Sequence, residues 1–402
     1  MPRSRFRAAL AAVREARAGQ RRNRTATARW ESESLGATFD PERYRERIAR
    51  SEQRLAAARR FEEPDQVPVQ ISVGGSFYCR LFGHNIAEYF QDRELSIEVQ
   101  LKGLRWAYDE LGDDRTGFGI GLDVGPIQEA LAFGAEIVRP DDTSPWGRHI
   151  IQTPADAEAL RVPDPAQTPG VQWYYGELQR LREAVQRLDI RLPVWGGLTI
   201  HPPLSAACAL AGPSLIYEWM CEEPGLVKRL FGKLFEAFCR LVDYRDSVTG
   251  ATTTSIGLAD DNSAFVSEAM YREFVLPYNS AIYERYGRDG RYLHADGPND
   301  HLFGLYANVL RLTEMDIGGF SDLAAAKREM HGKTVIIGGL NCKDLYGDFE
   351  AARPAVERAV AIGAPGGGYI FGVGGETYAG VNPDTLIRSV RHAQQISRRR
   401  PA

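Results

Sequence analysis

Long hydrophobic runs are missing from this 402-residue sequence: no apolar stretch approaches the roughly 18–20 residues that a membrane-spanning helix needs. The N-terminus also lacks the apolar core of a secretory signal. Cysteine is scarce, and the five thiols are an odd number without a Cys-Xaa-Xaa-Cys pair, which argues against a disulfide framework. The net charge of −4 argues against a general nucleic-acid surface. We therefore expect a cytoplasmic protein that acts on a small molecule, with neither nucleic acid nor membrane as a partner.

What the sequence does contain is a repeated pattern of short apolar stretches, each followed by a polar or glycine-rich corner and then a helix-like segment. These stretches lie at residues 69–73, 118–122, 194–198, 255–258, 291–293, 310–312, 334–337 and 369–371. The residues able to do chemistry cluster just after them. In a (β/α)8 barrel, the loops after the strands build the active site at the C-terminal face. The pattern therefore predicts an α/β fold, a single (β/α)8 TIM barrel.

The length exceeds the roughly 250 residues of a bare barrel, which leaves room for an N-terminal addition. We expect a basic, helical N-terminal extension over residues 1–63, with a helix at 41–61 that covers the bottom or side of a barrel over residues 64–397. The first thirty residues hold nine arginines and one acid. Such a segment could contact an acidic partner, act as a transit peptide or form a solvated helix. A proline-rich loop over residues 139–170 is expected to carry Trp146 and His149 over the barrel mouth.

Four residues at the predicted strand ends are candidates for catalysis: Asp123, His201, Asp261 and His294. Burying an acid in an apolar mouth is costly unless it meets a cation or a donor, so Asp123 predicts a ligand contact. The alternative is an N-cap of the helix that starts near residue 126. His201 could carry a proton or form a rim contact. Because Asp260 and Asp261 are adjacent, only one can face the lumen in extended structure, and the other is expected to cap a helix near Ser267.

Glu314 and Asp316 flank the sixth stretch, and surface salt bridges with Arg311 or Lys327 are the alternative to a role in the mouth. Aromatic residues are frequent around the predicted mouth, which would suit a planar ligand, although core packing also explains aromatics. The residues expected to bind substrate are Tyr78, Arg80, Trp146, His149, Trp195, Asn341 and Tyr378.

Several sequence blocks follow one another along residues 64–394. They are Val67-Pro-Val, Asp123-Val-Gly-Pro, His201-Pro-Pro-Leu-Ser, Asp260-Asp261 followed by Tyr271-Arg-Glu-Phe, His294-Ala-Asp-Gly, Lys333-Thr-Val-Ile-Ile-Gly-Gly-Leu-Asn341 and Gly367-Gly-Tyr-Ile. In this order, and on the predicted strand ends, they resemble the uroporphyrinogen decarboxylase superfamily, which also contains the cobalamin-linked methyltransferases. The resemblance implies a TIM barrel enzyme and makes a homodimer plausible.

The sequence departs from authentic uroporphyrinogen decarboxylases at two places. Those enzymes carry an arginine-rich loop after the first strand that grips the carboxylates of their substrate. Here the loop at residues 74–80 retains one arginine, Arg80, and each guanidinium fork matches one carboxylate. Near the last strand the decarboxylases have Gly-His-Gly, where this chain has Gly375. We therefore do not expect the haem-pathway reaction.

The methyltransferase branch binds zinc through a His-Xaa-Cys pair at the fifth strand end and a cysteine after the last strand. This sequence keeps the histidine, His294, but has Asp296 in place of the first cysteine and Glu376 near the position of the second. Imidazole plus carboxylates is an accepted zinc set, and harder ligands admit other divalent metals. The predicted metal ligands are therefore His294, Asp296 and Glu376, with Cys342 as a fourth. The alternative is a metal-free His294 that acts as a general acid or base.

Three functions fit these observations. The first is methyl transfer between a corrinoid such as methylcobalamin, or a similar carrier, and a small-molecule nucleophile, with zinc and a corrinoid carrier protein as partners. The second is cofactor-independent decarboxylation, or another acid/base reaction, on a small or aromatic carboxylic acid. The third is a binding barrel without catalysis, because fold alone does not dictate function. Of these three hypotheses, the retention of His294 favours methyl transfer.

Overall fold

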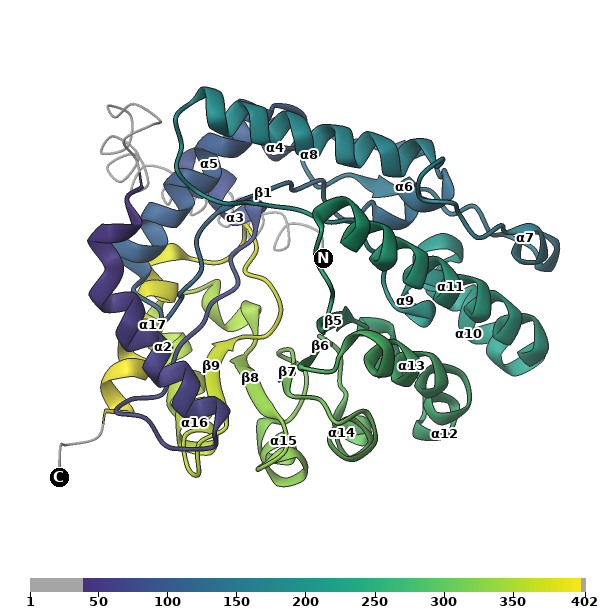
Figure 1. Ribbon diagram of the computed structural model, residues 1–402. Helices are drawn as coiled ribbons and strands as arrows, with labels where there is room; N and C mark the ends of the chain where they lie inside the picture. The colour runs from purple at the N-terminus through teal and green to yellow at the C-terminus, as the bar shows by residue number, and fades with distance from the viewer. Residues whose placement is uncertain (1–38, 399–402) are drawn as a thin grey trace, which may run out of the picture.

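The computed structural model describes residues 39–398 and shows a TIM barrel of the α/β class, in which helices surround parallel strands (Figure 1). The barrel strands are β1 (Ile120–Gly121), β4 (Val194–Trp195), β5 (Ser255–Ala259), β6 (Gly290–His294), β7 (Glu314–Asp316), β8 (Val335–Leu340) and β9 (Tyr369–Val373). The remaining barrel position is the extended segment 69–73. Two further strands, β2 (Ile137–Val138) and β3 (Trp146–Gly147), form an antiparallel hairpin outside the barrel.

Strands β5 to β9 form one parallel ladder in sequence order, and β1 pairs with β4 in a second parallel ladder. Segment 69–73 joins the first ladder through parallel bridges from Val69 to Phe371 and from Val73 to Thr377. Within the larger ladder, His294 lies opposite Asp316. Because the strands are parallel, their C-terminal residues meet at one end of the barrel.

Two buried carboxylates take over hydrogen bonds that a neighbouring strand would make with segment 69–73. Asp114 accepts from the backbone N–H of Val69 at 3.0 Å, and Asp113 accepts from that of Ile71 at 3.1 Å. Arg115 pairs with Asp113 at 2.7 Å and donates to the Ile71 carbonyl at 3.2 Å. Buried backbone groups need hydrogen-bond partners, so the Asp113–Arg115 ion pair stabilises segment 69–73 in its place in the barrel.

The surrounding helices are α2 (Arg45–Arg59), α3 (Gly75–Phe82), α4 (Ile86–Gln91), α5 (Arg93–Trp106), α6 (Gln128–Phe133), α7 (Pro154–Ala159), α8 (Pro169–Arg187), α9 (Pro203–Ala211), α10 (Pro213–Glu222), α11 (Pro224–Thr249), α12 (Glu268–Met270), α13 (Leu276–Tyr286), α14 (Phe303–Leu305), α15 (Leu323–Met330), α16 (Phe349–Gly363) and α17 (Pro383–Ile396). Single helical turns lie between them at η2 (Pro41–Tyr44), η3 (Ala107–Leu111), η4 (Asp261–Phe265), η5 (Tyr271–Val275), η6 (Asp300–Leu302), η7 (Tyr306–Leu310) and η8 (Cys342–Leu345). Among residues 39–398, none of these helices is both long and apolar enough to span a bilayer.

Helix α8 illustrates how the sequence sets a helix and its buried face. Pro169 occupies the first turn, where its fixed φ suits a helix and its missing N–H costs nothing. Val171, Tyr174, Leu178 and Leu181 recur every three or four residues and are buried. This spacing places them on one side of the helix, against the barrel.

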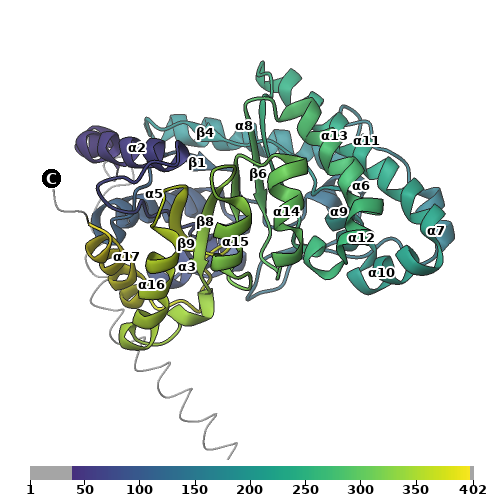
Figure 2. The ribbon, with the colours of Figure 1, turned by 90° about the horizontal axis from the view of Figure 1, so that it is seen from below.

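The predicted helix at 41–61 appears as η2 followed by α2, on the side of the barrel that holds β9 and α17 (Figure 2). Leu55 and Ala58 of α2 are buried with Val335 and Ile370 of the last two strands. The described chain begins at residue 39, so the arginine-rich segment of the first thirty residues lies outside it.

The sixth strand lies later than the sequence pattern indicated. We predicted it at residues 310–312, but Leu310 ends a helical turn, and Arg311 adopts a left-handed conformation with a φ of 55°. This backbone cannot continue as a strand, so Leu312 is buried next to the turn and β7 starts at Glu314. The predicted proline-rich loop at 139–170 likewise contains β3 and α7.

Candidate active site

Four charged side chains meet at the C-terminal end of β6, and His294 lies at their centre. Its Nδ1 is 3.2 Å from Oδ2 of Asp316, the last residue of the neighbouring strand β7. Asp316 is buried, and it also accepts from the backbone N–H groups of Gly318 and Gly375, both at 3.2 Å. Asp316 thus fixes the orientation of the imidazole and leaves Nε2 directed at the other two carboxylates.

The Nε2 side of His294 faces Asp261 and Asp296. Nε2 is 3.7 Å from Oδ1 of Asp261 and 3.6 Å from Oδ2 of Asp296. One ligand atom from each of these three residues lies within 4.8 Å of the others. Oδ1 of Asp296 is buried and has no hydrogen-bond partner among the described residues. A buried oxygen without a partner is costly, so a cation or hydrogen-bond donor placed here would be stabilised.

Charge at this centre favours the imidazolium form of His294. Burial by itself lowers the pKa of His294, but hydrogen bonds and attraction from Asp296 and Asp316 outweigh burial and raise the pKa to about 10. In the absence of a metal, His294 therefore carries a proton and a positive charge at neutral pH.

Two further acids border the same space. The carboxylate of Glu376 rests on Gly74, where an added Cβ would lie 2.5 Å from its Cδ, so a larger residue at position 74 would displace the Glu376 carboxylate. Burial raises the pKa of Glu376, and the nearby Asp123 raises it further, while His294 opposes both. Glu376 thus interacts electrostatically with Asp123, His294 and Asp296, the three residues predicted to lie near it.

Asp123 does not act as the helix cap that we had considered as an alternative. Its Oδ2 accepts from the hydroxyl of Tyr89 at 3.1 Å, and its Oδ1 accepts from the N–H of Gly125 at 3.0 Å. Helix α6 starts five residues after Asp123, and its N-cap residue, Ile127, makes no side-chain cap. The carboxylate therefore holds the turn after β1 and faces the space beside Glu376.

Asp260 and Asp261 separate as expected, but the buried member is not a helix cap near Ser267. Asp260 is buried and accepts from Ser205 at 2.7 Å, from Ser263 at 2.5 Å and from Asn279 at 2.9 Å. Burial raises the pKa of Asp260, although these three donors oppose the shift. The cap near residue 267 is the hydroxyl of Ser267 itself, which accepts from Met270.

His201 stands at the end of the segment after β4, beside a buried acid that the sequence pattern did not reveal. Oε1 of Glu129 in α6 accepts from Nδ1 of His201 at 2.8 Å and from its backbone N–H at 2.7 Å. Burial lowers the pKa of His201, but attraction from Glu129, and more weakly from Asp261 and Asp260, produces a net rise. Glu129 lies six residues after Asp123 in a helix start, a position with no distinctive motif.

Two of the predicted metal ligands, His294 and Asp296, lie in one cluster of possible ligands. The group that the structure brings within ligand distance holds Asp261 with His294 and Asp296, whereas Glu376 and Cys342 lie outside it. Sγ of Cys342 is 3.1 Å from the carbonyl oxygen of Glu376. Burial raises the pKa of the Cys342 thiol to about 11 in the absence of a metal.

The salt bridges that we considered for the sixth strand are also corrected. Glu314, at the start of β7, pairs with Arg59 of α2 at 2.5 Å. Lys327 donates instead to the carbonyls of Pro365 and Gly367. Asp316 is a member of the His294 centre, and its role was hidden because the strand that carries it was placed four residues early.

Two of the predicted substrate-binding residues have structural contacts. Tyr78 is buried in the core against Phe82 and Trp106, a position that does not support substrate binding. Asn341 caps η8 by accepting from Lys343 and donates to the carbonyl of Gly319. Both polar ends of the Asn341 side chain are therefore occupied.

The other five lie at or near the surface. Tyr378 is closest to the site: burial raises its pKa to about 12, with contributions from Asp296 and Glu376. Arg80 donates a hydrogen bond to the Ala379 carbonyl, and the exposed Trp195 donates one to the Phe118 carbonyl. Trp146 lies on the hairpin beside Arg148, and His149 lies against Gly212 at the end of α9.

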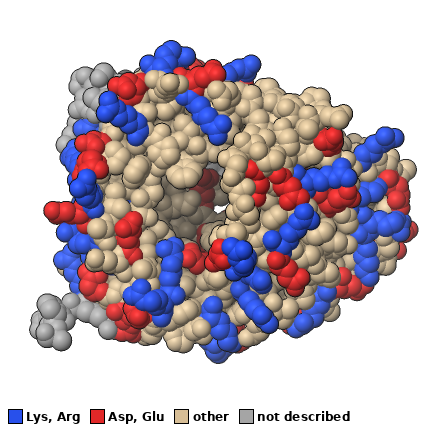
Figure 3. All heavy atoms as spheres, viewed as in Figure 1, with Lys and Arg blue, Asp and Glu red and all other residues tan. Residues whose placement is uncertain are grey.

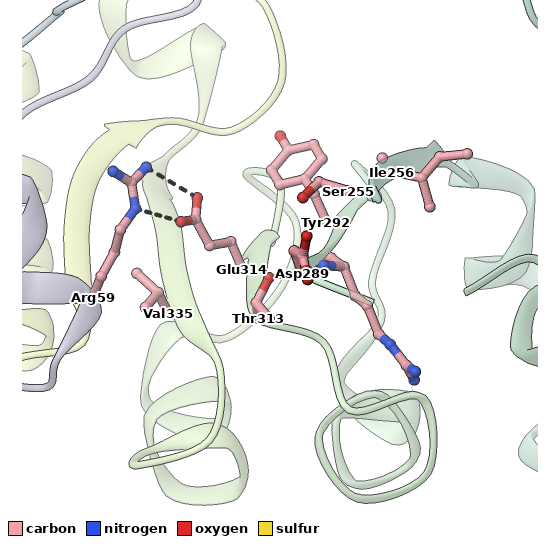
Figure 4. Close-up of a pocket in the computed structure, with 11 residues that line it drawn as sticks. Arg59, Ser255, Ile256, Asp289, Tyr292, Thr313, Glu314 and Val335 are labelled. Atoms are coloured by element: carbon pink, nitrogen blue, oxygen red, sulfur yellow. Dashed lines mark hydrogen bonds and ion pairs between the residues drawn. The ribbon is translucent and has the colours of Figure 1, made fainter. Parts of the chain in front are cut away.

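A cavity of about 530 Å³ opens at the other end of the barrel. Figure 3 shows the molecule hollowed near the centre of the face seen in Figure 1. The cavity lining includes Ser255, Gly290, Glu314 and Val335, the first residues of β5 to β8, and the Arg59–Glu314 pair (Figure 4). The N-terminal ends of barrel strands serve stability rather than catalysis, so this cavity is separate from the His294 centre.

Comparison with known proteins identifies a family whose sequence profile matches most of this chain. The profile of the family "Uroporphyrinogen decarboxylase (URO-D)" matches residues 50–396. A uroporphyrinogen decarboxylase from Alkalilimnicola ehrlichii is 25% identical over 294 residues, 69% of this chain and 75% of that protein. One from Saccharopolyspora erythraea is 26% identical over 376 residues, 85% of this chain and 94% of its own length.

Among solved structures, a methyltransferase from Methanosarcina mazei has a similar fold, with a TM-score of 0.63 and 18% sequence identity. The similarity covers 86% of this chain and 98% of that one. Identities near one quarter, together with the loop that retains only Arg80, fit membership of the superfamily and not the authentic decarboxylase. The chain belongs to the uroporphyrinogen decarboxylase (URO-D) family.

Proposed function

We propose that the protein is a metal-assisted methyltransferase, which moves a methyl group between a corrinoid or similar carrier and a small-molecule nucleophile. The observation that carries the proposal is the cluster of Asp261, His294 and Asp296 at the catalytic end of the barrel, with Asp316 behind the imidazole. The fold shared with the Methanosarcina mazei methyltransferase is consistent with it.

The residues present fit a divalent metal such as Zn²⁺. One imidazole and two carboxylates form a three-ligand set, which leaves a coordination position open for a substrate. A histidine ligand usually donates its other N–H to a carboxylate, and Asp316 takes this place at Nδ1 of His294. The unpartnered Oδ1 of Asp296 gives the metal a further acceptor. Oxygen-rich ligands also admit other divalent ions.

When bound, the metal would act as a Lewis acid that lowers the pKa of the nucleophile. The residues of the chain prepare this site. Asp316 holds His294 in place, and Asp261 is positioned by accepting from the N–H of Asp296 at 2.8 Å. Glu376, whose pKa is raised by burial and by Asp123, lies beside this cluster, and Tyr378 borders the entrance.

Metal content tests this proposal directly. The purified protein should hold about one equivalent of a divalent metal by elemental analysis, and His294→Ala and Asp296→Ala should each deplete it. The matched control is Glu314→Gln, which removes a carboxylate at the opposite end of the barrel and should leave the metal content unchanged. Equal Zn²⁺ binding by the wild type and His294→Ala would overturn the proposed site.

The second candidate is a cofactor-independent decarboxylase, or another acid/base enzyme, that acts on a small or aromatic carboxylic acid. The raised pKa of His294, about 10, favours it, because without a metal the imidazolium would pair with a substrate carboxylate and supply a proton. An active protein free of metal would select this function. A corrinoid carrier protein is the partner that the first function would call for, and the family resemblance favours a homodimer.

A further inference from the structure

We propose that Glu129 and His201 form a carboxylate–imidazole pair that accepts the proton of the substrate, and that the substrate nucleophile is a hydroxyl group. The inference rests on the proposed methyl transfer and names its substrate class. In this pair His201 would be the catalytic base, and Glu129 the positioning residue behind it. The proposal is based on the contacts of Glu129 and His201 on the side of the barrel mouth formed by α6 and the start of α9.

Glu129 forms two hydrogen bonds with His201. Its Oε1 accepts from the backbone N–H of His201 at 2.7 Å and from Nδ1 at 2.8 Å. The Glu129 side chain is 5% exposed and that of His201 is 28% exposed. With the Nδ1 proton directed at the carboxylate, the neutral ring keeps its lone pair on Nε2, which has no hydrogen-bond partner among the described residues. A base held by a carboxylate in this manner recurs in unrelated hydrolytic enzymes.

The backbone around His201 keeps the ring beside the metal-ligand cluster. His201 precedes Pro202 and Pro203, which restrict it to extended conformations and start α9. Helix α9 is joined to the turn after β5, because Oγ of Ser205 donates to Asp260 at 2.7 Å. That turn carries Asp261, so the imidazole and the cluster border the same space.

The charged groups around His201 come from two elements. Glu129 approaches from α6, and Asp260 and Asp261 approach from the end of β5. All three favour the imidazolium, which makes the ring a better proton acceptor than an isolated histidine. Within residues 39–398 no hydrogen bond joins His201 to Asp261, His294 or Asp296, and the pair interacts with this cluster through the electrostatic attraction of Asp261.

A hydroxyl nucleophile needs such an acceptor more than a thiol does. A thiol ionises near pH 8.5, whereas even a phenol such as tyrosine retains its proton until about pH 10. The carboxylates at Asp261 and Asp296 are hard ligands, which suit oxygen better than sulfur. In the step, Nε2 takes the proton and the O–H bond breaks. The oxygen keeps that electron pair and forms the C–O bond, while the carrier retains the pair of the broken carrier–methyl bond.

Nuclear magnetic resonance of the full chain, with its seven histidines labelled with ¹⁵N, tests the pair without a substrate. The His201 signals are assigned by their absence in His201→Gln. We expect the Nδ1–H tautomer and a titration midpoint above 6.5, and Glu129→Gln should move the midpoint to lower pH. The control is Glu136→Gln, an exposed glutamate paired with Arg148. An unchanged His201 midpoint in Glu129→Gln would overturn the pair.

The hydroxyl assignment is tested with methylcobalamin as donor and either phenol or 2-mercaptoethanol as the probe nucleophile. We expect His201→Gln to lower the phenol rate by roughly 10²–10⁴-fold, with a much smaller effect on the thiol rate. In Glu129→Gln the acid limb of the phenol pH profile should move to lower pH. A wild-type protein that does not methylate phenol overturns the assignment.

Zn²⁺ titration separates this inference from the proposed function. We expect His201→Gln and Glu129→Gln to bind Zn²⁺ as the wild type does, because neither side chain is a ligand. Loss of Zn²⁺ binding in both would place the pair in the metal site and overturn the separate role. If the wild type binds no divalent metal while the His201 titration behaves as expected, the proposed function fails and the pair stands.

Discussion

Replacing Asp316 by asparagine tests whether the carboxylate behind His294 supports a metal ligand. Asp316 accepts three hydrogen bonds: Oδ1 accepts from the N–H of Gly318, and Oδ2 accepts from the N–H of Gly375 and from Nδ1 of His294. Asparagine keeps the shape of the side chain, but one of its two ends is an NH₂ donor. In either amide orientation that donor faces an N–H group, so at least one of these bonds is lost.

The expected loss in Zn²⁺ affinity follows from this geometry. Removing a carboxylate that orients a histidine ligand weakens metal binding by about 10–100-fold. At about 1.4 kcal/mol for each factor of ten, this corresponds to about 1.4–2.8 kcal/mol. Asp316 is only 6% exposed, so solvent cannot replace the lost bond, and we expect a result near the upper limit.

Isothermal titration with Zn²⁺ at constant pH measures this effect. Glu314→Gln is the matched control, because it changes a carboxylate of the same strand at the opposite end of the barrel. Thermal unfolding of the metal-free variants shows whether Asp316→Asn remains folded. A folded Asp316→Asn protein with wild-type Zn²⁺ affinity would refute the role of Asp316 as the support of His294.

Three further outcomes follow from the structure. The folded-state pKa of His294 is about 10, above the ordinary value of about 6.5. The protonated imidazole therefore stabilises the metal-free protein fully below about pH 6.5, and this stabilisation disappears as the pH rises to about 10. Urea unfolding across this range should show the loss in the wild type and a flatter profile in His294→Gln. Gly375→Ala and Gly83→Ala should each lower the free energy of unfolding by about 1–2 kcal/mol, because both glycines have a left-handed backbone conformation. Only Gly375→Ala should weaken Zn²⁺ binding, since its Cβ would lie 2.4 Å from Oδ2 of the proposed ligand Asp296. Asp113→Asn should destabilise the fold by about 3–5 kcal/mol because Arg115 loses its buried partner, and a change below about 1 kcal/mol in urea unfolding would contradict that role.

Most of the barrel could be predicted from local sequence because each strand is a short apolar segment with polar residues after it. Strands β5, β6, β8 and β9 lie close to the predicted positions. The sixth strand was misplaced because Leu310 and Leu312 are apolar and buried, yet the left-handed Arg311 between them excludes a strand. Backbone conformation at one residue decided this position, and the apolar pattern does not encode it.

The candidate site was only partly predictable. His294 and Asp296 could be found because they follow a strand directly, and the resemblance to zinc-binding relatives pointed to the same positions. Asp261 could be identified as a mouth residue, but its place among the metal ligands depends on the distance between two loops. Glu129 follows no strand and was missed, because its partner lies 72 residues away in sequence.

The amino-acid sequence by itself determined most of the strands and the end of the barrel at which the acids and histidines gather, because hydrophobic periodicity and strand-end chemistry are local properties. The tertiary structure decided which of these side chains meet. Parallel register placed Asp316 opposite His294, and the packing of α6 beside the start of α9 brought Glu129 to His201. Both contacts depend on how distant segments align, which is set by the packing of the whole barrel.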